Sequence, residues 1–216
     1  MTKFAWAART ALGGRPVNED SWRAQYEPMG CFVVADGLGG HGGGHIASAI
    51  VSDAALAGVC RYSSASPENA VALMNIAADA LREKLVENLS GMRSTLTVLL
   101  IDRDSAAWAW VGDTRLYHFS GGKAIYCTPD HTVAGKLVAS GELDADEIRF
   151  NEDRSMLLRA LGSHNQTPET GEAPCKPGDA WLICSDGWWE PVLDEEWSNC
   201  LAKAALPVTG WMPWTR

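Results

Sequence analysis

The chain lacks the patterns that direct a protein into a membrane or out of the cell. No apolar run approaches the ~18 residues that a membrane span needs, and the N-terminal MTKFAWAART does not have the basic-then-apolar order of a signal peptide. The six cysteines show no CxxC spacing, and several lie in apolar strand-like runs where a thiol behaves as a small hydrophobe. These absences predict a cytoplasmic protein without a membrane partner.

Basic charge is also scarce. The 18 Lys and Arg residues are outnumbered by 27 Asp and Glu residues, which gives a net charge of −9 and a pI of about 5.0. Because a phosphate backbone demands clustered Lys and Arg, we do not expect a nucleic-acid partner. The 216 residues, 46% of them apolar, can bury one good core, and no boundary is visible, so we predict a single domain over residues 1–216.

Motifs for covalent catalysis and for nucleotide binding are missing as well. The sequence has neither a CxxxxxR loop nor a GxSxG elbow, so no Cys or Ser nucleophile is expected. The glycines at 39–44 lack the Gly-Lys-Ser/Thr of a Walker loop. His41 and His45 have a zinc-like spacing, but the glycines between them argue against the helix that would bring the two rings together.

Apolar patterns predict strands first, then two helices. Short apolar runs predict strands over 4–9, 21–26 and 31–35. A segment rich in Ala, Ile and Val runs from about 45 to 60, and a second helix opens with Ser66 as N-cap and Pro67 at its first position. Apolar side chains at intervals of three and four make this helix long and amphipathic: Val71, Met74, Ala78, Leu81, Leu85 and Leu89.

Strand patterns return after Gly91. They predict an antiparallel meander over 94–101, 106–111, 115–119 and 123–127, and one further buried strand over 180–184. Residues 128–165 are more polar, include a predicted helix at 131–140, and form either a flap-like insertion over a site or a plain surface insertion. This order is typical of sheets covered by helices. We predict an α+β fold, a four-layer α/β/β/α sandwich of two antiparallel sheets flanked by helices.

Three aspartates share one context. Asp36, Asp113 and Asp186 each lie at or near the end of a predicted strand and each adjoins a glycine. A single Asp-Gly pair is as well explained by a hairpin turn. Three of them, with Glu19-Asp20 beside them, favour a cleft that holds a hard divalent cation, because Mg²⁺ and Mn²⁺ prefer carboxylate oxygens and keep several waters.

Seven separated motifs carry a resemblance to a known family. They are RPVNEDS at 15–21, VADGLGGH at 34–41, STLT at 94–97, VGDTR at 111–115, DH at 130–131, RALG at 159–162 and CSDG at 184–187. The chain resembles, over roughly residues 4–195, the metal-dependent protein serine/threonine phosphatases of the PP2C type, bacterial branch. Any one motif would be weak, but all seven in this order are specific.

The resemblance implies a metal centre. By this resemblance Asp36 bridges two metal ions, with the Gly37 carbonyl as an additional ligand. The acidic pair Glu19 and Asp20 lies near the second ion, directly or through water, and Asp186 is a ligand of the first. The implied cofactors are Mn²⁺ or Mg²⁺, two ions or three.

The resemblance also assigns the remaining groups. Asp113 matches a ligand of the third, weaker metal of bacterial members. His41 is a candidate general acid because of its place in the glycine-rich turn beside Asp36 and not by the resemblance, since the position that carries histidine in many eukaryotic relatives is Leu38 here. Arg15 lies at the phosphate-clamping position, where a guanidinium offers paired donors to phosphate oxygens; from spacing alone, an arginine in an exposed turn is a fair alternative. In the implied mechanism, a metal-bridging hydroxide attacks phosphorus while the metals and Arg15 offset the developing charge.

The chain departs from the family pattern at its C-terminal end. Relatives carry an Asp-Asn pair before a last buried strand, and that aspartate is a further ligand of the first metal. Here Glu195 leads into an atypical tail at 197–216, as if the C-terminal part were truncated, and no such pair follows Asp186. The first metal is therefore expected to bind more weakly.

Two functions follow from these patterns. The first is hydrolysis of phosphoserine and phosphothreonine on a bacterial signalling protein, in a pathway with a cognate Ser/Thr kinase that the enzyme opposes. The alternative is a weak or inactive phosphatase-like module that binds a phosphoprotein or a regulatory partner. Retention of mutually repelling carboxylates favours the enzyme, and the missing C-terminal ligand favours the module.

Overall fold

The computed structural model describes residues 5–27, 29–38, 43–86 and 91–203, and their strands form two antiparallel sheets. The larger sheet has the order β1-β2-β4-β5-β8, with β3 paired to β2. Its strands are β1 (Asp20–Gln25), β2 (Gly30–Leu38), β3 (Arg93–Ser94), β4 (Leu96–Ile101), β5 (Ser105–Val111) and β8 (Glu169–Pro174). The smaller sheet has the order β7-β6-β9, formed by β6 (Arg115–Ser120), β7 (Lys123–Cys127) and β9 (Ala180–Cys184).

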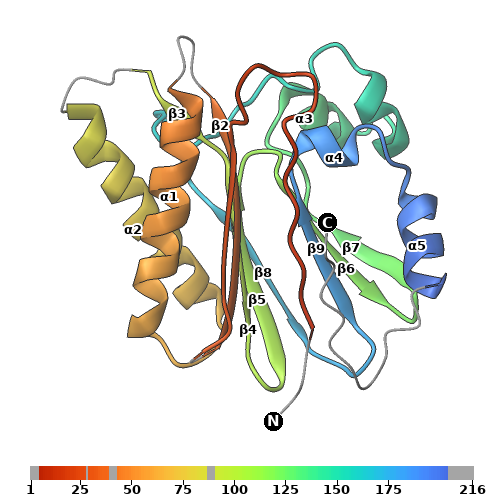
Figure 1. The fold of residues 1–216 in the computed structure, drawn as a ribbon. Coiled ribbons are helices and arrows are strands. Elements are labelled where there is room, and N and C mark those ends of the chain that lie inside the picture. Colours follow the sequence, from red (N-terminus) through yellow and green to blue (C-terminus); the bar gives the residue numbers. More distant parts are fainter. Residues whose placement is uncertain (1–4, 28, 39–42, 87–90, 204–216) are drawn as a thin grey trace.

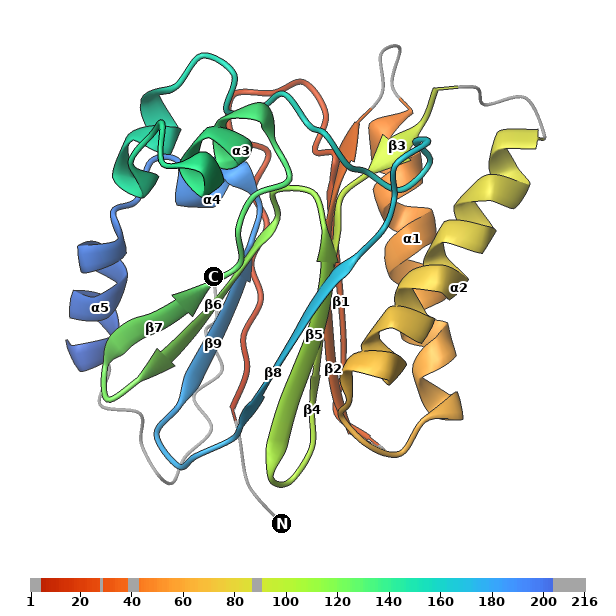
Figure 2. The ribbon, with the colours of Figure 1, turned by 180° about the vertical axis from the view of Figure 1, so that it is seen from behind.

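Helices cover the outer face of each sheet. The larger sheet is covered by α1 (Gly44–Gly58), continued by the 3-10 turn Val59–Arg61, and by α2 (Pro67–Val86). On the side of the smaller sheet lie α3 (Val133–Ser140), the 3-10 segment η2 (Ala145–Phe150), α4 (Asp186–Trp189) and α5 (Asp194–Lys203). Figure 1 shows the resulting order of helix, sheet, sheet and helix, and Figure 2 shows it from behind with β8 at the edge of the larger sheet. The predicted four-layer sandwich is confirmed.

The local signals for the second helix are also confirmed. Pro67 is its first residue, and the Ser66 hydroxyl accepts a hydrogen bond from the Asn69 amide at 3.2 Å, as an N-cap side chain does. In α3, Thr132 caps the Gly135 amide at 2.9 Å, and Gly141, with φ of 78°, ends the helix.

Two of the predicted strand assignments are wrong. The described part of 4–9 has no regular structure; instead, Trp6 places its ring 6.3 Å from the Trp22 ring and 6.1 Å from the Phe32 ring. Side-chain packing against β1 and β2 thus replaces backbone pairing. The expected meander is also divided between the sheets, because β5 pairs with β4 and β8 whereas β6 pairs with β7 and β9.

The segment 128–165 is partly core. Thr132, Ala134, Ile148 and Leu161 are all buried, and Leu161 belongs to the cluster under α1 and α2. Its polar composition predicted an insertion outside the core, either over a site or on the plain surface, but the few apolar residues within it anchor it to both halves of the molecule. Among the described residues, no helix has the length and apolar character needed to cross a bilayer.

Packing between α2 and the larger sheet is expected to dominate stability. Leu73 on α2 is fully buried in the cluster that includes Val33 of β2 and Val98 of β4. Leu73→Ala should lower the free energy of unfolding by about 2–5 kcal/mol, because a cavity remains where the side chain was. Urea denaturation would measure this, with Ile125→Ala as control, since Ile125 is 60% exposed; equal losses in both variants would contradict the expectation.

Candidate metal centre

Asp36 lies inside β2, directly opposite Asp20 of β1. Its backbone is held on the other side by Thr95: the Asp36 amide donates to Thr95 Oγ1 at 2.8 Å, and the Thr95 amide donates to the Asp36 carbonyl at 2.8 Å. The predicted strand end at Asp36 is therefore too early, because Gly37 still pairs with Ser94 of β3. Pairing on both sides fixes the direction in which the Asp36 carboxylate projects.

Glu19, Gly37 and the start of α1 meet beside Asp36. The Gly37 amide donates to the Glu19 carbonyl at 3.0 Å. A Cβ on Gly44, the first residue of α1, would lie 2.6 Å from the Gly37 carbonyl oxygen and would also collide with Glu19 Oε1. Glycine at 44 therefore allows a carboxylate and a backbone carbonyl, both oxygen donors, to approach the same helix end.

A hydrogen bond joins the first strand to the segment that carries Asp186. The Ser185 hydroxyl donates to Asp20 Oδ2 at 2.7 Å, although 165 positions separate the two residues. Asp186 follows as the first residue of α4. The sequence motifs NED and SDG are thus brought into contact, as the prediction of one shared site requires.

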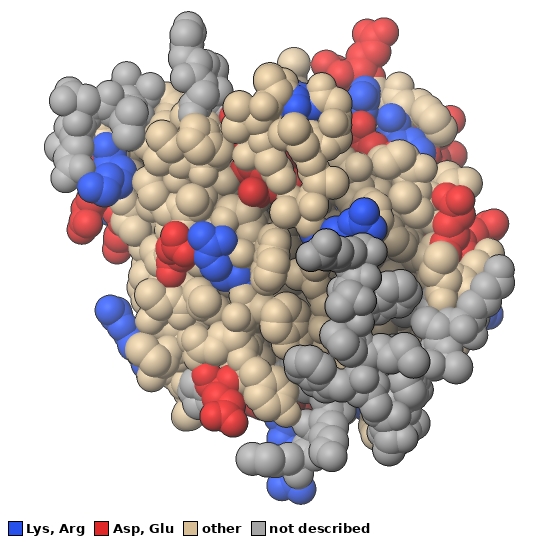
Figure 3. All heavy atoms as spheres, in the orientation of Figure 1, with Lys and Arg blue, Asp and Glu red and all other residues tan. Residues whose placement is uncertain are grey.

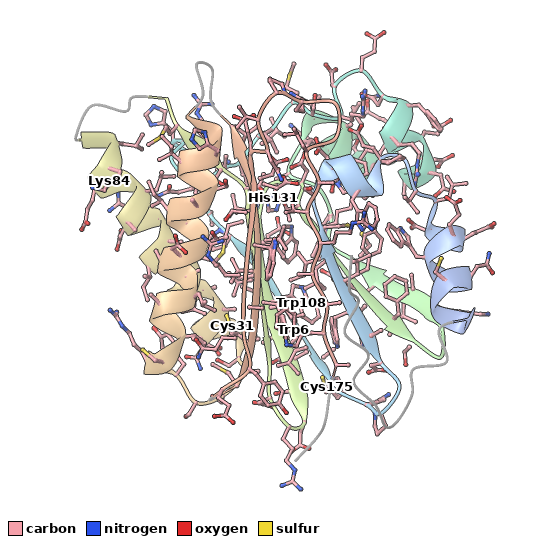
Figure 4. The ribbon with its side chains drawn as sticks, viewed as in Figure 1. Trp6, Cys31, Lys84, Trp108, His131 and Cys175 are labelled. Carbon is pink, nitrogen blue, oxygen red and sulfur yellow. The ribbon has the colours of Figure 1, made fainter. Side chains whose placement is uncertain are left out.

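Asp113 occupies the turn that leaves the larger sheet for the smaller one. Gly112 has a φ of 107°, and a Cβ there would lie 2.5 Å from the Thr95 side chain, so this turn requires glycine. His131 binds Gly112 twice: its Nδ1 accepts from the Gly112 amide at 3.1 Å, and its own amide donates to the Gly112 carbonyl at 3.0 Å. Figure 4 shows His131 between the two sheets, with Trp108 and Trp6 lower in the same layer.

The predicted acidic residues act on one another electrostatically. The pKa of Asp36 is raised to about 9, chiefly by burial and then by the nearby carboxylates of Asp186, Asp20, Asp113 and Glu19, in that order. The pKa of Asp113 is raised to about 8, by burial first and then by Asp130 and Asp186. The pKa of Asp20 is also raised, chiefly by burial, against the lowering effect of its Ser185 hydrogen bond.

This repulsion suits a hydrated hard cation. Among the described residues, no group of three or more His, Cys, Asp or Glu side chains could hold a metal ion, so a site closed by side chains alone, as structural zinc needs, is not formed there. Mg²⁺ and Mn²⁺ need less from the protein, because waters complete an octahedron around a few carboxylates. The predicted ligands of this site, the surrounding acidic side chains and the Gly37 carbonyl, are all oxygen donors. In Figure 3, acidic side chains are set back in the surface where the upper parts of the two sheets meet.

Arg15 lies beside this group on an exposed turn. Its amide donates to the Leu12 carbonyl at 3.3 Å, and it lines a hollow together with Pro16, Val17 and Glu19. Arg15 therefore lines the same hollow as Glu19, one of the predicted ligands. His41, the candidate general acid, lies outside the described residues.

A buried ion pair supports the Asp113 turn and was not predicted from the sequence. Arg115 donates to both oxygens of Asp130, at 2.8 and 2.7 Å, and its guanidinium carbon lies 3.5 Å from the centre of the Trp189 ring. Trp189 in turn donates from Nε1 to the Asp113 carbonyl at 3.0 Å. The one signal in the sequence was an arginine within an apolar strand, because a buried charge needs a partner of opposite charge. The sequence did not identify Asp130 as that partner.

Two arginines of the 128–165 segment hold the far end of α4. Arg149 Nη1 donates to the Glu190 carbonyl at 3.3 Å and to the Val192 carbonyl at 3.0 Å. Arg154 Nε lies 2.8 Å from Glu190 Oε1. The segment over the smaller sheet is thereby connected to the residues that directly follow Asp186.

Comparison with known proteins identifies the family of this chain. A family model described as Protein phosphatase 2C matches residues 12–208. The chain belongs to the protein phosphatase 2C family. The serine/threonine protein phosphatase PstP of Mycobacterium tuberculosis (strain H37Rv) is 31% identical over 198 residues, which make up 88% of this chain and 37% of that protein. The chain thus spans little more than a third of that relative's length.

Solved structures of the protein phosphatase 2C family share the fold. The crystal structure of the Mycobacterium tuberculosis serine/threonine phosphatase PstP/Ppp has a TM-score of 0.77 and 31% identity, and the match covers 89% of this chain and 81% of that one. A structure of the catalytic domain of PstP in complex with two manganese ions has a TM-score of 0.72 and 28% identity, covering 89% and 86%. These likenesses extend across both sheets rather than one motif.

Proposed function

We propose that this chain is a metal-dependent phosphatase that hydrolyses phosphoserine and phosphothreonine on a protein of a Ser/Thr kinase pathway, which it opposes. One observation carries the proposal: half-buried Asp36 lies within electrostatic reach of Asp20, Asp113, Asp186 and Glu19, in a chain of the protein phosphatase 2C family. A fold has no physical need for such repulsion unless cations offset it. The names of the relatives, serine/threonine protein phosphatases, support the substrate class.

The proposed cofactors are two or three Mn²⁺ or Mg²⁺ ions, in line with the two manganese ions named for the PstP catalytic domain. Asp36 would be a ligand of both of the first two ions, with the Gly37 carbonyl as an additional ligand. Asp186 would hold the first ion, and Glu19 with Asp20 would hold the second, directly or through water. Asp113 would hold the third. When bound, such ions supply an activated water and offset charge on the phosphoryl oxygens.

The chain's own residues position the phosphate and shield the site. Arg15 would donate two parallel hydrogen bonds to phosphate oxygens from the hollow that it shares with Glu19. The Ser185 bond to Asp20 keeps that carboxylate directed toward Asp186. The segment 128–165 would lie over the site as a flap and contact the substrate protein.

A direct assay separates this function from a binding module without turnover. The full chain would be incubated with an aryl phosphate and with a phosphothreonine peptide, with Mn²⁺ or with EDTA. We expect hydrolysis with Mn²⁺ and none with EDTA. Binding of the phosphopeptide and of Mn²⁺ without hydrolysis would instead identify a phosphatase-like module.

Arg15→Ala is expected to lower kcat/KM by about ten- to hundred-fold, because the variant loses charged hydrogen bonds worth ~1.5–3 kcal/mol. Mn²⁺ affinity, measured by titration calorimetry, should not change, since Arg15 is not a ligand. Arg82→Ala is the matched control, because Arg82 is exposed on α2 and pairs with Asp79. An Arg15 variant as active as the Arg82 variant would show that Arg15 is only an exposed turn residue.

A further inference from the structure

Two of the proposed metal ligands come from different parts of the sandwich and are joined by one side chain. Asp113 lies in the turn between the larger and the smaller sheet, and Asp186 begins α4 after the last strand of the smaller sheet. Trp189, the last residue of α4, is 1% exposed and donates from its indole nitrogen to the Asp113 carbonyl at 3.0 Å. The distance between the two carboxylates therefore depends on this contact.

Trp189 is itself fixed from the opposite face. The Arg115 guanidinium lies flat against its ring at 3.5 Å, and the same guanidinium is held by both oxygens of Asp130 and donates to the Tyr117 hydroxyl at 3.1 Å. Arg115 and Asp130 are both buried, so neither side chain can turn away into solvent. A cation against an indole face is an attractive arrangement, and it is stronger when water is excluded.

The short helix α4 transmits this restraint to Asp186. Residues three apart in a helix share a face, and Asp186 and Trp189 have this spacing within four residues. The Trp189 amide also donates to the Ser185 carbonyl at 3.2 Å, and Ser185 holds Asp20. A rotation of α4 would displace both Asp186 and the Asp113 turn.

We propose that Trp189, held against Arg115, is a positioning residue that sets the spacing of Asp113 and Asp186 for their ions. The inference rests on the proposed function, because it requires both carboxylates to be metal ligands. Trp189 does not touch the reacting atoms; it acts through the Asp113 carbonyl and through α4. Its effect should therefore appear in metal binding before it appears in turnover.

Trp189→Phe tests the hydrogen bond directly, because phenylalanine keeps a ring against Arg115 but has no donor. Mn²⁺ titrations of the full chain by calorimetry, with bound ions counted by electron paramagnetic resonance, should show affinity at the weakest site reduced about 10- to 100-fold, as is usual when a ligand's support is removed. Trp108→Phe is the matched control: Trp108 is 3% exposed in the core between the sheets. That variant should lose stability without losing Mn²⁺ affinity.

A double-mutant cycle with Asp113→Asn distinguishes the role of Trp189 from the proposed role of Asp113 as a ligand. If Trp189 acts through Asp113, Trp189→Phe should add little at the weakest site once Asp113→Asn is present. Unchanged Mn²⁺ binding in Asp113→Asn alone would overturn the proposed role of Asp113. A second outcome would overturn the role of Trp189 alone. In that outcome Asp113→Asn loses Mn²⁺ affinity, whereas the Mn²⁺ affinity of Trp189→Phe equals that of Trp108→Phe.

A second variant, Arg115→Lys, tests the same proposal if Trp189→Phe does not fold. Arg115→Lys keeps the charge but loses both the flat contact on Trp189 and the paired bonds to Asp130. We expect the same site to weaken, in a protein whose circular dichroism shows a folded chain. A folded Arg115→Lys variant with wild-type Mn²⁺ affinity at every site would contradict the proposal.

Discussion

Asp36→Asn is expected to abolish Mn²⁺-dependent phosphate hydrolysis, with a loss of at least about a thousand-fold in kcat. Asparagine has nearly the same shape, and the backbone bonds to Thr95 do not involve the side chain, so the strand pairing of β2 should persist. What is lost is a negative charge at the position that four other carboxylates surround. Hydrolysis of an aryl phosphate at saturating Mn²⁺ measures the effect.

Asp79→Asn is the matched control for this experiment. Asp79 is 62% exposed on α2 and pairs with Arg82, so the same chemical change there should leave activity intact. The Asp36 variant should also be at least as stable as the wild type when metal is chelated, because asparagine removes the free-energy cost of keeping this carboxylate protonated in the folded state. Substantial Mn²⁺-dependent turnover by Asp36→Asn would refute the assignment of Asp36 as the bridging ligand.

Sequence periodicity predicted most of the helices and strands, but it did not predict which sheet each strand joins. The amphipathic spacing and the Ser66-Pro67 start predicted α2 well, since its two signals are local. The division of the expected meander at Gly112 was missed, because apolar runs on both sides look alike whichever sheet they join. Only the positive φ of Gly112 and its fit against Thr95 direct the chain into the second sheet.

The acidic residues of the site could be named from the sequence, whereas their supports could not. Asp36, Asp113 and Asp186 stand out because each carboxylate adjoins glycine near a strand end. Trp189 looks like an ordinary apolar residue of the tail, and its role depends on a hydrogen bond across 76 positions. Likewise, alternation predicted a strand at 4–9 but could not reveal that Trp6 packs on Trp22 and Phe32 instead.

Without metal, the protein should become less stable as the pH rises, and Mn²⁺ should reverse this trend. The folded-state pKa values of Asp36 and Asp113 are raised to about 9 and about 8, from an ordinary value near 4. Between these values the folded protein holds protons that the unfolded chain releases, so stability is greatest at low pH and is lost as the pH rises through the folded-state values. The total loss is on the order of several kcal/mol.

The pH range from 7 to 8 gives the cleanest measurement of this linkage. The pKa of His131 is lowered, chiefly by burial, from its ordinary value of about 6.5. Below about pH 6.5 this group makes the free energy of unfolding rise with pH, which is opposite to the effect of the two aspartates. The thiols of buried Cys31 and half-buried Cys127, whose pKa values are raised to about 12, add their own loss of stability above about 8.5, where free thiols ionise. Urea unfolding with EDTA at pH 7 and 8 should therefore show a falling free energy of unfolding in the wild type and a flatter response in Asp36→Asn.

Mn²⁺ should stabilise the protein more at pH 8 than at pH 7. Ligand carboxylates must lose their protons to bind a cation, so at higher pH less free energy is spent on deprotonation. At a hundred-fold excess over its dissociation constant, one ion adds about 2.7 kcal/mol to the free energy of unfolding. Asp36→Asn should lose most of this gain and Asp79→Asn none of it. Two results would contradict a shared site for these carboxylates. One is a free energy of unfolding that rises from pH 7 to 8 in the wild type with EDTA, and the other is an increase on adding Mn²⁺ that is smaller at pH 8 than at pH 7.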